Sequence, residues 1–262
     1  MKDTMFIHRG DVDLYVEDFG GHGPPVVLLH GLAGSSREMR PTAGALRGRR
    51  VVLLDQRGHG RSTRRPGDVS RRAFVHDVVE VVERLFPEQA VDLVGQSVGA
   101  HTAFMTACAR PDLVRRLVML EGHVRGSDDP GEARRLGRYF SSWPVPFADE
   151  EEARGFLGRG ALADAWIADL EPARDGLRPR FDADVMEATL AEVHVPRWVE
   201  WTRLRVPTTA VFAEAGLFDA AQRSELIECR PQTRRVDLVG VGHDAHLEAP
   251  EAWAEVLRAE LA

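Results

Sequence analysis

A serine between two glycines is the part of this sequence best suited to chemistry. The motif Gly95-Gln96-Ser97-Val98-Gly99 follows a short apolar run, 90–94, and precedes a stretch compatible with a helix. A residue held at a sharp strand-to-helix turn has a strained backbone, so its neighbours two positions away must be nearly free of side chains. The pattern therefore predicts a Ser97 hydroxyl exposed at the tip of the turn. The amide of Val98 would face the same space, at the positive end of the helix.

A serine hydroxyl is a weak nucleophile unless other groups activate it. An imidazole must take its proton, and a buried carboxylate must hold that imidazole in one tautomer and stabilise its cationic form. His243 lies at a turn after the last predicted strand, where a base can reach Ser97, and His246 competes with it for this role. His101 and His123 are expected near the site, as part of its lining.

The elements that must position these groups alternate along the chain. Buried apolar runs predict strands, and apolar residues at helical spacing, as in 70–86, predict the helices between them. The predicted strands are 5–7, 12–19, 26–29, 50–54, 90–94, 116–120, 207–213 and 235–239. Such alternation implies right-handed crossovers and a mostly parallel sheet, with the reacting groups at the carboxyl ends of the strands. The loops at His30 and Asp55, together with Ser97 and Glu121, follow such ends.

The loop 55–62 carries several charges whose expected role is structural. Asp55 and Arg57 are expected to tie neighbouring loops together by hydrogen bonds, and His59 is expected to pack within the loop. None of the three is predicted to be a catalytic group.

The alternation of strands and helices stops between 123 and about 204. No strand is predicted there, and the segment consists of helical pieces separated by Pro and Gly, at 132–140, 149–157, 162–170 and 182–193. We therefore predict a helical cap, 123–204, over a core domain made of 1–122 and 205–262. Trp143, Trp166 and Trp198 are expected to wall an apolar pocket above Ser97, although aromatic residues in such a segment can also serve only to attach the cap to the core.

The composition excludes several classes of function. The chain has 262 residues, 44% of them hydrophobic, and a net charge of −7, which argues against nucleic acid as a partner. No apolar run is long enough to cross a bilayer, and the first residues lack the apolar stretch of a secretory signal, so a cytoplasmic protein without membrane contact is expected. Cys108 and Cys229 are expected to be free thiols, and no residue cluster suggests a metal or a cofactor. The chain is expected to be a monomer or a homodimer.

With these pieces placed, the chain resembles the α/β-hydrolase superfamily over nearly its whole length. The matching stretches are His30-Gly31, 55–62, Gly95-Gln96-Ser97-Val98-Gly99 and Gly242-His243. The resemblance implies a mostly parallel eight-stranded sheet with helices on both faces and an inserted helical cap. It also implies that Ser97 is the nucleophile, that His243 is the general base, and that the amides of Leu32 and Val98 form an oxyanion hole.

The carboxylate departs from the usual pattern of this superfamily. Most members carry an aspartate in the turn after the seventh strand, but here that turn reads Ala213-Glu214-Ala215-Gly216, with Gly216 in the place of the acid. Glu121, Asp219 and Glu214 could each substitute. The fungal zearalenone lactonases, and the haloalkane dehalogenases with an acid after the sixth strand, look similar at this point because they carry a glutamate there. We favour Glu121, at the end of the sixth strand, and keep Asp219 and Glu214 as alternatives.

The type of nucleophile limits the reaction. Members of this superfamily that displace carbon-bound leaving groups use an aspartate, whereas Ser97 indicates acyl transfer at a carbonyl. An aromatic cap favours a hydrophobic small molecule, so the predicted activity is hydrolysis of a carboxylic ester or lactone through an acyl-enzyme. Hydrolysis of an amide, a thioester or a carbon–carbon bond uses the same groups and remains open. The alternative outside the enzymes is a non-catalytic receptor that binds a small ligand.

Overall fold

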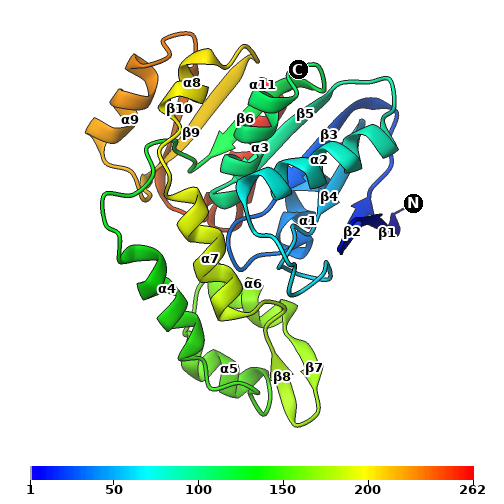
Figure 1. Cartoon of the computed structure of the whole chain (residues 1–262), viewed down its shortest axis with the longest axis vertical. Helices are drawn as coiled ribbons and strands as arrows, with labels where there is room; N and C mark the ends of the chain where they lie inside the picture. The colour runs from blue at the N-terminus through cyan, green and yellow to red at the C-terminus, as the bar shows by residue number, and fades with distance from the viewer. Residues whose placement is uncertain (1) are drawn as a thin grey trace.

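Eight strands form the central sheet of the computed structural model, which describes residues 2–262 (Figure 1). They are β1 (Asp3–Arg9), β2 (Val12–Asp18), β3 (Gly23–Leu29), β4 (Arg49–Leu54), β5 (Val91–Gln96), β6 (Val114–Leu120), β9 (Thr208–Ala215) and β10 (Arg234–Gly242). Their order across the sheet is β1-β2-β4-β3-β5-β6-β9-β10. The β1–β2 and β2–β4 pairs are antiparallel and all the others are parallel. The predicted mostly parallel eight-stranded sheet is confirmed.

The central strands are buried on both faces. Successive side chains of a strand point to opposite sides of the sheet. Val27 and Leu29 of β3 therefore join the core on one face, and Val26 and Leu28 join the core on the other. All four residues are at most 1% exposed. This is why the strand is a continuous apolar run in the sequence, with no polar residue facing solvent.

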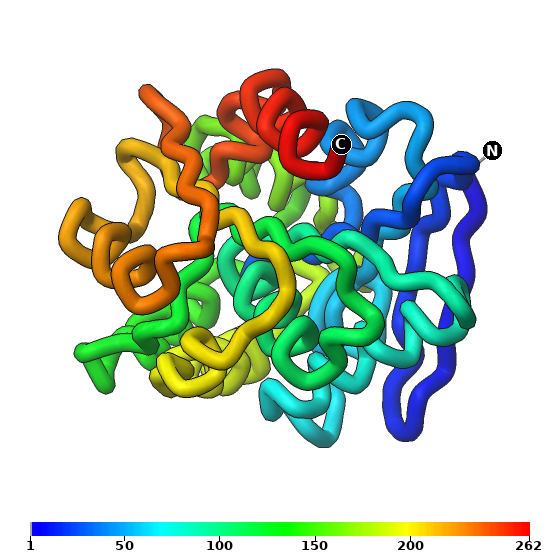
Figure 2. The backbone as a smooth tube through the Cα atoms, turned by 90° about the horizontal axis from the view of Figure 1, so that it is seen from above, coloured from blue at the N-terminus to red at the C-terminus, as the bar shows by residue number. Residues whose placement is uncertain are grey.

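Helices cover both faces of this sheet. On one face lie α2 (Arg71–Leu85), α3 (Val98–Ala109) and α9 (Ala220–Glu228), whose apolar residues share a core with Val27 and Leu29. On the other face lie α1 (Ser36–Ala45), the short α10 (Ala245–Glu248) and α11 (Pro250–Glu260). Figure 2 shows α11, in red, on one side of the strands and α3, in green, on the other. The predicted layers, with helices on both faces, are confirmed.

The segment between β6 and β9 forms a largely helical unit with its own core. It contains α4 (Glu132–Ser141), α5 (Glu150–Leu157), α6 (Ala161–Asp169) and α7 (Ala183–Val193), close to the four predicted helical pieces. These helices lie below the sheet in Figure 1. The buried residues at their centre are separate from the two cores of the sheet: Ala33, Phe140, Trp143, Phe147, Ala153, Ile167, Phe181, Val185 and Met186.

The prediction that this segment contains no strand is wrong. A small antiparallel hairpin, β7 (Glu171–Ala173) and β8 (Gly176–Arg178), follows α6. The turn between its strands consists of Arg174 and Asp175, and β8 begins at Gly176, whose φ of 144° suits a glycine. The hairpin is held to the cap because the backbone of Phe147 exchanges hydrogen bonds of 2.8 and 2.7 Å with that of Leu177.

The last helix before β9 belongs by its packing to the core rather than to the cap. α8 (Trp198–Arg203) was not predicted, and it buries Trp201 completely in the core on the α2–α3 face. The indole nitrogen of Trp201 donates a 2.9 Å hydrogen bond to the Leu226 carbonyl of α9. The segment predicted as the cap, 123–204, therefore includes one helix, α8, whose Trp201 packs in the core of the sheet.

The charged loop after β4 ties its neighbours together, as predicted. Asp55 accepts hydrogen bonds from the amides of Ser36 (2.5 Å) and Arg61 (2.7 Å). Arg57 pairs with Asp77 of α2 through two hydrogen bonds of 2.6 Å, and both side chains are almost fully buried. Bidentate pairs of this kind fix the direction of a loop. The loop therefore has a fixed position between the sheet and α2.

None of the helices in residues 2–262 combines the length and the apolar composition that a transmembrane helix needs.

Candidate active site

Ser97 occupies a strained turn between β5 and α3. Its backbone has φ 52° and ψ −117°, a conformation that residues other than glycine rarely adopt. The turn is tight because the backbone on either side approaches closely. A Cβ atom on Gly95 would lie 2.3 Å from the carbonyl carbon of Gly99, and one on Gly99 would lie 2.3 Å from the carbonyl oxygen of Leu29. The sequence prediction of a sharp strand-to-helix turn is confirmed.

Replacement of Gly99 by alanine should strongly destabilise the protein. The added methyl group meets the backbone carbonyl oxygens of Leu29, the last residue of β3, at 2.3 Å and of His30 at 2.4 Å, and the central strand leaves them little freedom to move. We expect the free energy of unfolding to fall by about 3 kcal/mol or more, measured by denaturant titration. The control is Gly44→Ala in α1, where an added Cβ meets no atom within 4 Å. A Gly99→Ala protein as stable as Gly44→Ala would contradict this account of the turn.

Glu121 brings a buried carboxylate to His243. One carboxylate oxygen, Oε2, lies 3.2 Å from Nδ1 of His243. The same carboxylate accepts 2.8 Å hydrogen bonds from the amides of Ala213 and Leu217, and its side chain has no exposed surface. Glu121 follows β6 directly and has a positive φ of 49°. The contact occupies Nδ1 of His243, so Nε2 is the nitrogen available for the proton of a hydroxyl group.

Gly216 makes room for this carboxylate. A Cβ atom at Gly216 would lie 2.2 Å from Oε2 of Glu121, so any larger residue there would collide with it. Gly216 is the position at which the sequence lacks the usual aspartate. The carboxylate of Glu121, contributed by the neighbouring strand, therefore fills the space that a side chain on the turn after β9 would need.

The other two candidate carboxylates have structural partners instead. Asp219 caps the N-terminus of α9, where its side chain accepts a 2.9 Å hydrogen bond from the Gln222 amide. Glu214 accepts a 2.8 Å hydrogen bond from the amide of Gly240. The structure thus brings Glu121 to His243, and neither Asp219 nor Glu214.

His246, the alternative to His243, lies away from the site. It is 1% exposed and its Nε2 lies 3.7 Å from Glu38 of α1. Gln96 instead joins the base loop to the serine turn, because its side-chain amide lies 3.3 Å from both the His243 carbonyl and Oδ1 of Asp244. This role of Gln96 was not predicted, since a residue between Gly95 and Ser97 gives no sequence signal of its partner.

One cavity of about 440 Å³ joins these groups beneath the cap. Ser97, Glu121 and His243 all line it, as do Leu32 and Val98, whose amides the resemblance assigns to an oxyanion hole. Val98 is the first residue of α3, so its amide has no partner within the helix. A hydroxyl, an imidazole and a carboxylate around one cavity, with the Val98 amide beside them, can perform acyl transfer.

The three predicted tryptophans occupy different places. Trp166 lines the cavity, as expected. Trp143 does not: it is 3% exposed and packs inside the cap, with ring centres 5.3 Å from Trp166 and 5.4 Å from Phe181. Trp198 does not line the cavity either, because its ring packs on His123 at 5.5 Å and on the core around Trp201. These two assignments are corrected: Trp143 holds the cap together, and Trp198 supports the wall behind His123.

Most of the apolar wall was not predicted. It is formed by side chains of three cap helices and of the segment after β9: Leu136, Phe140, Leu162, Leu190, Val193, Leu217 and Phe218. Leu136 and Phe140 lie four residues apart on α4, and Leu190 and Val193 lie three apart on α7. Such spacings place side chains on one helix face, which is the sequence signal that could have identified them.

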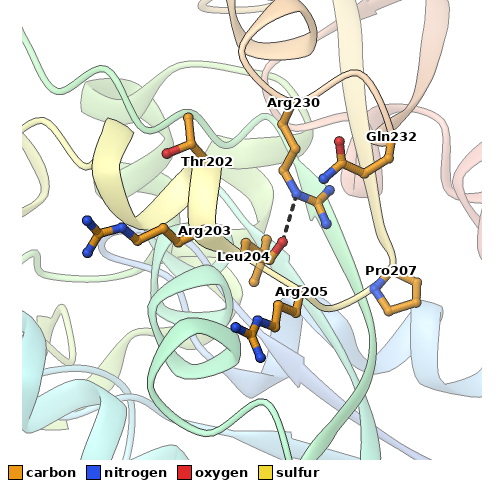
Figure 3. A pocket seen from close by; sticks show the side chains of 7 residues that line it. All are labelled: Thr202, Arg203, Leu204, Arg205, Pro207, Arg230 and Gln232. Atoms are coloured by element: carbon orange, nitrogen blue, oxygen red, sulfur yellow. Dashed lines mark hydrogen bonds between the residues drawn. The ribbon is translucent and has the colours of Figure 1, made fainter.

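A second, more open hollow of about 890 Å³ lies elsewhere on the surface (Figure 3). It is lined by Arg203, Arg205 and Arg230 among others, and by none of the residues around Ser97. The guanidinium of Arg230 already donates to the carbonyls of Leu204 and Val206 and to the hydroxyl of Thr233. The side chain of Arg230 is therefore already engaged within the protein. Among residues 2–262 there is also no group of three His, Cys, Asp or Glu side chains placed to hold a metal ion.

Three buried histidines are held neutral in this region of the fold. Burial lowers the pKa of His59 to about 3 and that of His123 to about 4, and it holds the pKa of His101 well below its ordinary value. In His123, Nε2 donates a 2.8 Å hydrogen bond to the Gln222 carbonyl, and Nδ1 accepts one from the Arg125 amide at 3.1 Å. His123 is therefore a fully paired part of the cavity wall.

These histidines predict a loss of stability in mild acid. Between about pH 6.5 and 4 the unfolded chain binds protons that the folded chain excludes, so the free energy of unfolding falls as the pH decreases. Each histidine contributes a slope of up to about 1.4 kcal/mol per pH unit. Denaturant titrations at about pH 7.5, 6 and 5 measure this slope. His59→Gln should reduce it by one such increment, whereas the exposed His76→Leu should leave it unchanged. A constant free energy of unfolding over this range would contradict the assignment of these histidines as neutral.

Comparison with known proteins agrees with this fold. The chain is 28% identical over 258 residues to the sn-1-specific diacylglycerol lipase ABHD11 of Mus musculus, covering 91% of this chain and 81% of that protein. It is 26% identical over 254 residues to the 2-(acetamidomethylene)succinate hydrolase of Mesorhizobium japonicum, covering 92% of this chain and 89% of the relative.

A solved structure shows the same arrangement of elements. The crystal structure of an E-2-(acetamidomethylene)succinate hydrolase superposes with a TM-score of 0.90 at 23% identity, over 100% of this chain and 99% of the other. The family model described as the alpha/beta hydrolase fold matches residues 24–159, slightly more than half of the chain. That range includes Ser97 and Glu121. The chain therefore belongs to the α/β-hydrolase fold family.

Proposed function

We propose that this hydrolase cleaves a carboxylic ester or lactone of a hydrophobic small molecule, through an acyl-enzyme on Ser97. The observation that carries the proposal is the shared cavity: Ser97 at its strained turn and His243, with its Nδ1 3.2 Å from the buried carboxylate of Glu121, both border it. This is the set of groups that acyl transfer requires.

Each side chain has a defined step in the proposed reaction. The Oγ atom of Ser97 bonds to the carbonyl carbon while its proton passes to Nε2 of His243. The carbonyl oxygen becomes an oxyanion that the amides of Leu32 and Val98 stabilise. Collapse of this intermediate breaks the bond to the alcohol, which leaves with the proton from His243. Water then repeats the sequence, regenerating Ser97 and releasing the acid, and Glu121 stabilises the imidazolium each time.

The cavity wall supports a largely apolar substrate. Leu136, Phe140, Trp166 and Leu190 line the cap side of the cavity. Apolar walls with a few placed polar groups are typical of sites for small organic molecules, and about 440 Å³ lies within the usual size range for them. The proposed reaction needs only these side chains and water, without a cofactor.

A panel of activated acyl compounds tests this proposal. We expect p-nitrophenyl esters of graded chain length, or aliphatic and aromatic lactones, to be hydrolysed, with a preference for chains long enough to contact the cap. A fluorophosphonate should modify Ser97 covalently. Tight binding of such ligands without turnover or labelling would instead identify a non-catalytic receptor, and would overturn the proposal.

A second candidate is hydrolysis of another acyl bond, such as an amide or a thioester. The Mesorhizobium relative supports it, because that protein is named as a hydrolase of 2-(acetamidomethylene)succinate, which contains an acetamido group. The two candidates differ in one measurement. An amide hydrolase retains comparable kcat/KM on an ester and the matched amide, whereas an esterase loses most of its activity on the amide.

A further inference from the structure

His101 is a buried histidine with no hydrogen-bond partner, and it lines the same cavity as Ser97. Its ring is 1% exposed, and within residues 2–262 neither of its nitrogens has a partner. An unpaired polar group in a protein interior costs free energy that a ligand can recover. His123, another histidine of this wall, has both nitrogens paired, so burial in this wall does not by itself leave a ring unpaired.

Positive charges surround this ring. After burial, the charges of Arg71, Arg197 and His194 are the causes that hold the pKa of His101 below its ordinary value. Arg71 is fully buried, and its only hydrogen bond within the described part of the chain goes to the hydroxyl of Thr102. No carboxylate of residues 2–262 lies within ion-pair distance of Arg71. Glu192 acts on Arg71 from beyond that distance and Arg197 pairs with Glu200 at 3.3 Å, so the positive charge near His101 is only partly compensated.

A further arginine reaches the cavity wall itself. Arg125 lines the cavity and pairs with Asp128 through one terminal nitrogen, at 2.5 Å, while its Nε lacks a partner. Glu132, a carboxylate of the same cavity wall, accepts a hydrogen bond from Ser127 and lies 3.6 Å from Nε2 of His194. Glu132 therefore has partners within the wall, whereas Nε of Arg125 and both ring nitrogens of His101 have none among the described residues.

We propose that His101 and Arg125 form a subsite for a carboxylate on the substrate. The inference rests on the proposed function and narrows its substrate class to an ester or lactone whose apolar skeleton also bears an acid group. His101 follows Ser97 by four residues on α3, a rise of about 6 Å, so the carboxylate lies a few bonds from the carbonyl that Ser97 attacks. A half-ester of a short dicarboxylic acid has this spacing.

Two matched esters test the subsite. Monoethyl glutarate carries the carboxylate, and ethyl 5-methylhexanoate replaces it by an isopropyl group of the same shape. We expect wild-type kcat/KM to favour monoethyl glutarate by about 10- to 100-fold, the range for hydrogen bonds to a charged group. His101→Leu and Arg125→Gln should each lose most of this preference, chiefly through KM. His76→Leu, on the exposed face of α2, should keep it. A wild-type preference for the isopropyl ester would overturn the subsite.

The stability of His101→Leu separates a binding role from a structural one. Leucine removes two unpaired polar atoms from the interior, so the variant should unfold at the same temperature as the wild type or higher. A structural histidine would instead lose stability when replaced. A His101→Leu protein with a lowered unfolding temperature and an unchanged ester preference would contradict the proposal.

Binding to an inactive protein distinguishes this proposal from the proposed function. Glutarate should bind to Ser97→Ala in calorimetry, and should bind at least tenfold more weakly when His101→Leu is added. If no ester is hydrolysed but glutarate binds in this way, the subsite stands and the proposed function fails. If neutral esters are hydrolysed but glutarate does not bind, the proposed function stands and the subsite fails.

Discussion

Replacing Ser97 by alanine is expected to lower turnover of any activated ester by about 10⁴- to 10⁶-fold. The alanine methyl group cannot form an acyl intermediate, and the remaining groups contribute only oxyanion stabilisation and binding. The loss should appear in kcat, measured with the best p-nitrophenyl ester. Labelling by a fluorophosphonate should disappear in the same variant, because the probe reacts with an activated hydroxyl.

The control for this change is a serine outside the cavity. Ser141→Ala, at the exposed end of α4, removes the same hydroxyl and should leave turnover and labelling intact. Alanine also tolerates the positive φ at position 97 no better than serine, so the unfolding temperature must be measured in parallel. Folded Ser97→Ala protein that retains ester turnover would show that another residue is the nucleophile.

The serine turn could be predicted from the sequence because its cause is local. Two glycines, an apolar run before them and a helical stretch after them are neighbours in the chain, and the structure has the strand, the turn and the helix in that order. The identity of the carboxylate could not be decided in this way. It depends on contacts between residues nearly a hundred positions apart, such as the 2.2 Å that would separate a Cβ at Gly216 from Glu121.

The cavity wall shows a second limit of sequence reasoning. Composition predicts an aromatic cap, but it does not say which rings face the substrate. Trp143 and Trp166 lie 23 positions apart, and their ring centres are 5.3 Å from one another, yet only Trp166 lines the cavity. The direction of each side chain depends on how α4 and α6 pack. The lack of hydrogen-bond partners for His101 also depends on the tertiary structure, because it is set by which side chains and backbone groups pack around the ring.

Glu121→Gln is expected to lower kcat by about 10³- to 10⁴-fold while the protein stays folded. The neutral amide no longer stabilises the imidazolium of His243, and it can hold the ring in the wrong tautomer. The carboxylate also accepts hydrogen bonds from the Ala213 and Leu217 amides, and glutamine offers only one oxygen to these donors. A loss of about 1–3 kcal/mol in the free energy of unfolding should therefore accompany the loss of activity. Steady-state kinetics and denaturant titration measure the two effects.

Asp219→Asn is the matched control, since it also neutralises a carboxylate near the end of β9. Asparagine caps helices about as well as aspartate, so neither stability nor kcat should change much. Full activity in Glu121→Gln together with an inactive Asp219→Asn would reverse the assignment.

Moving the carboxylate from position 121 to position 216 is a sharper form of the test. Gly216→Asp alone should reduce activity, because its side chain collides with Glu121, whereas Glu121→Ala combined with Gly216→Asp should recover part of it. Recovery would mean that His243 requires a negative charge in this space, whichever strand supplies it.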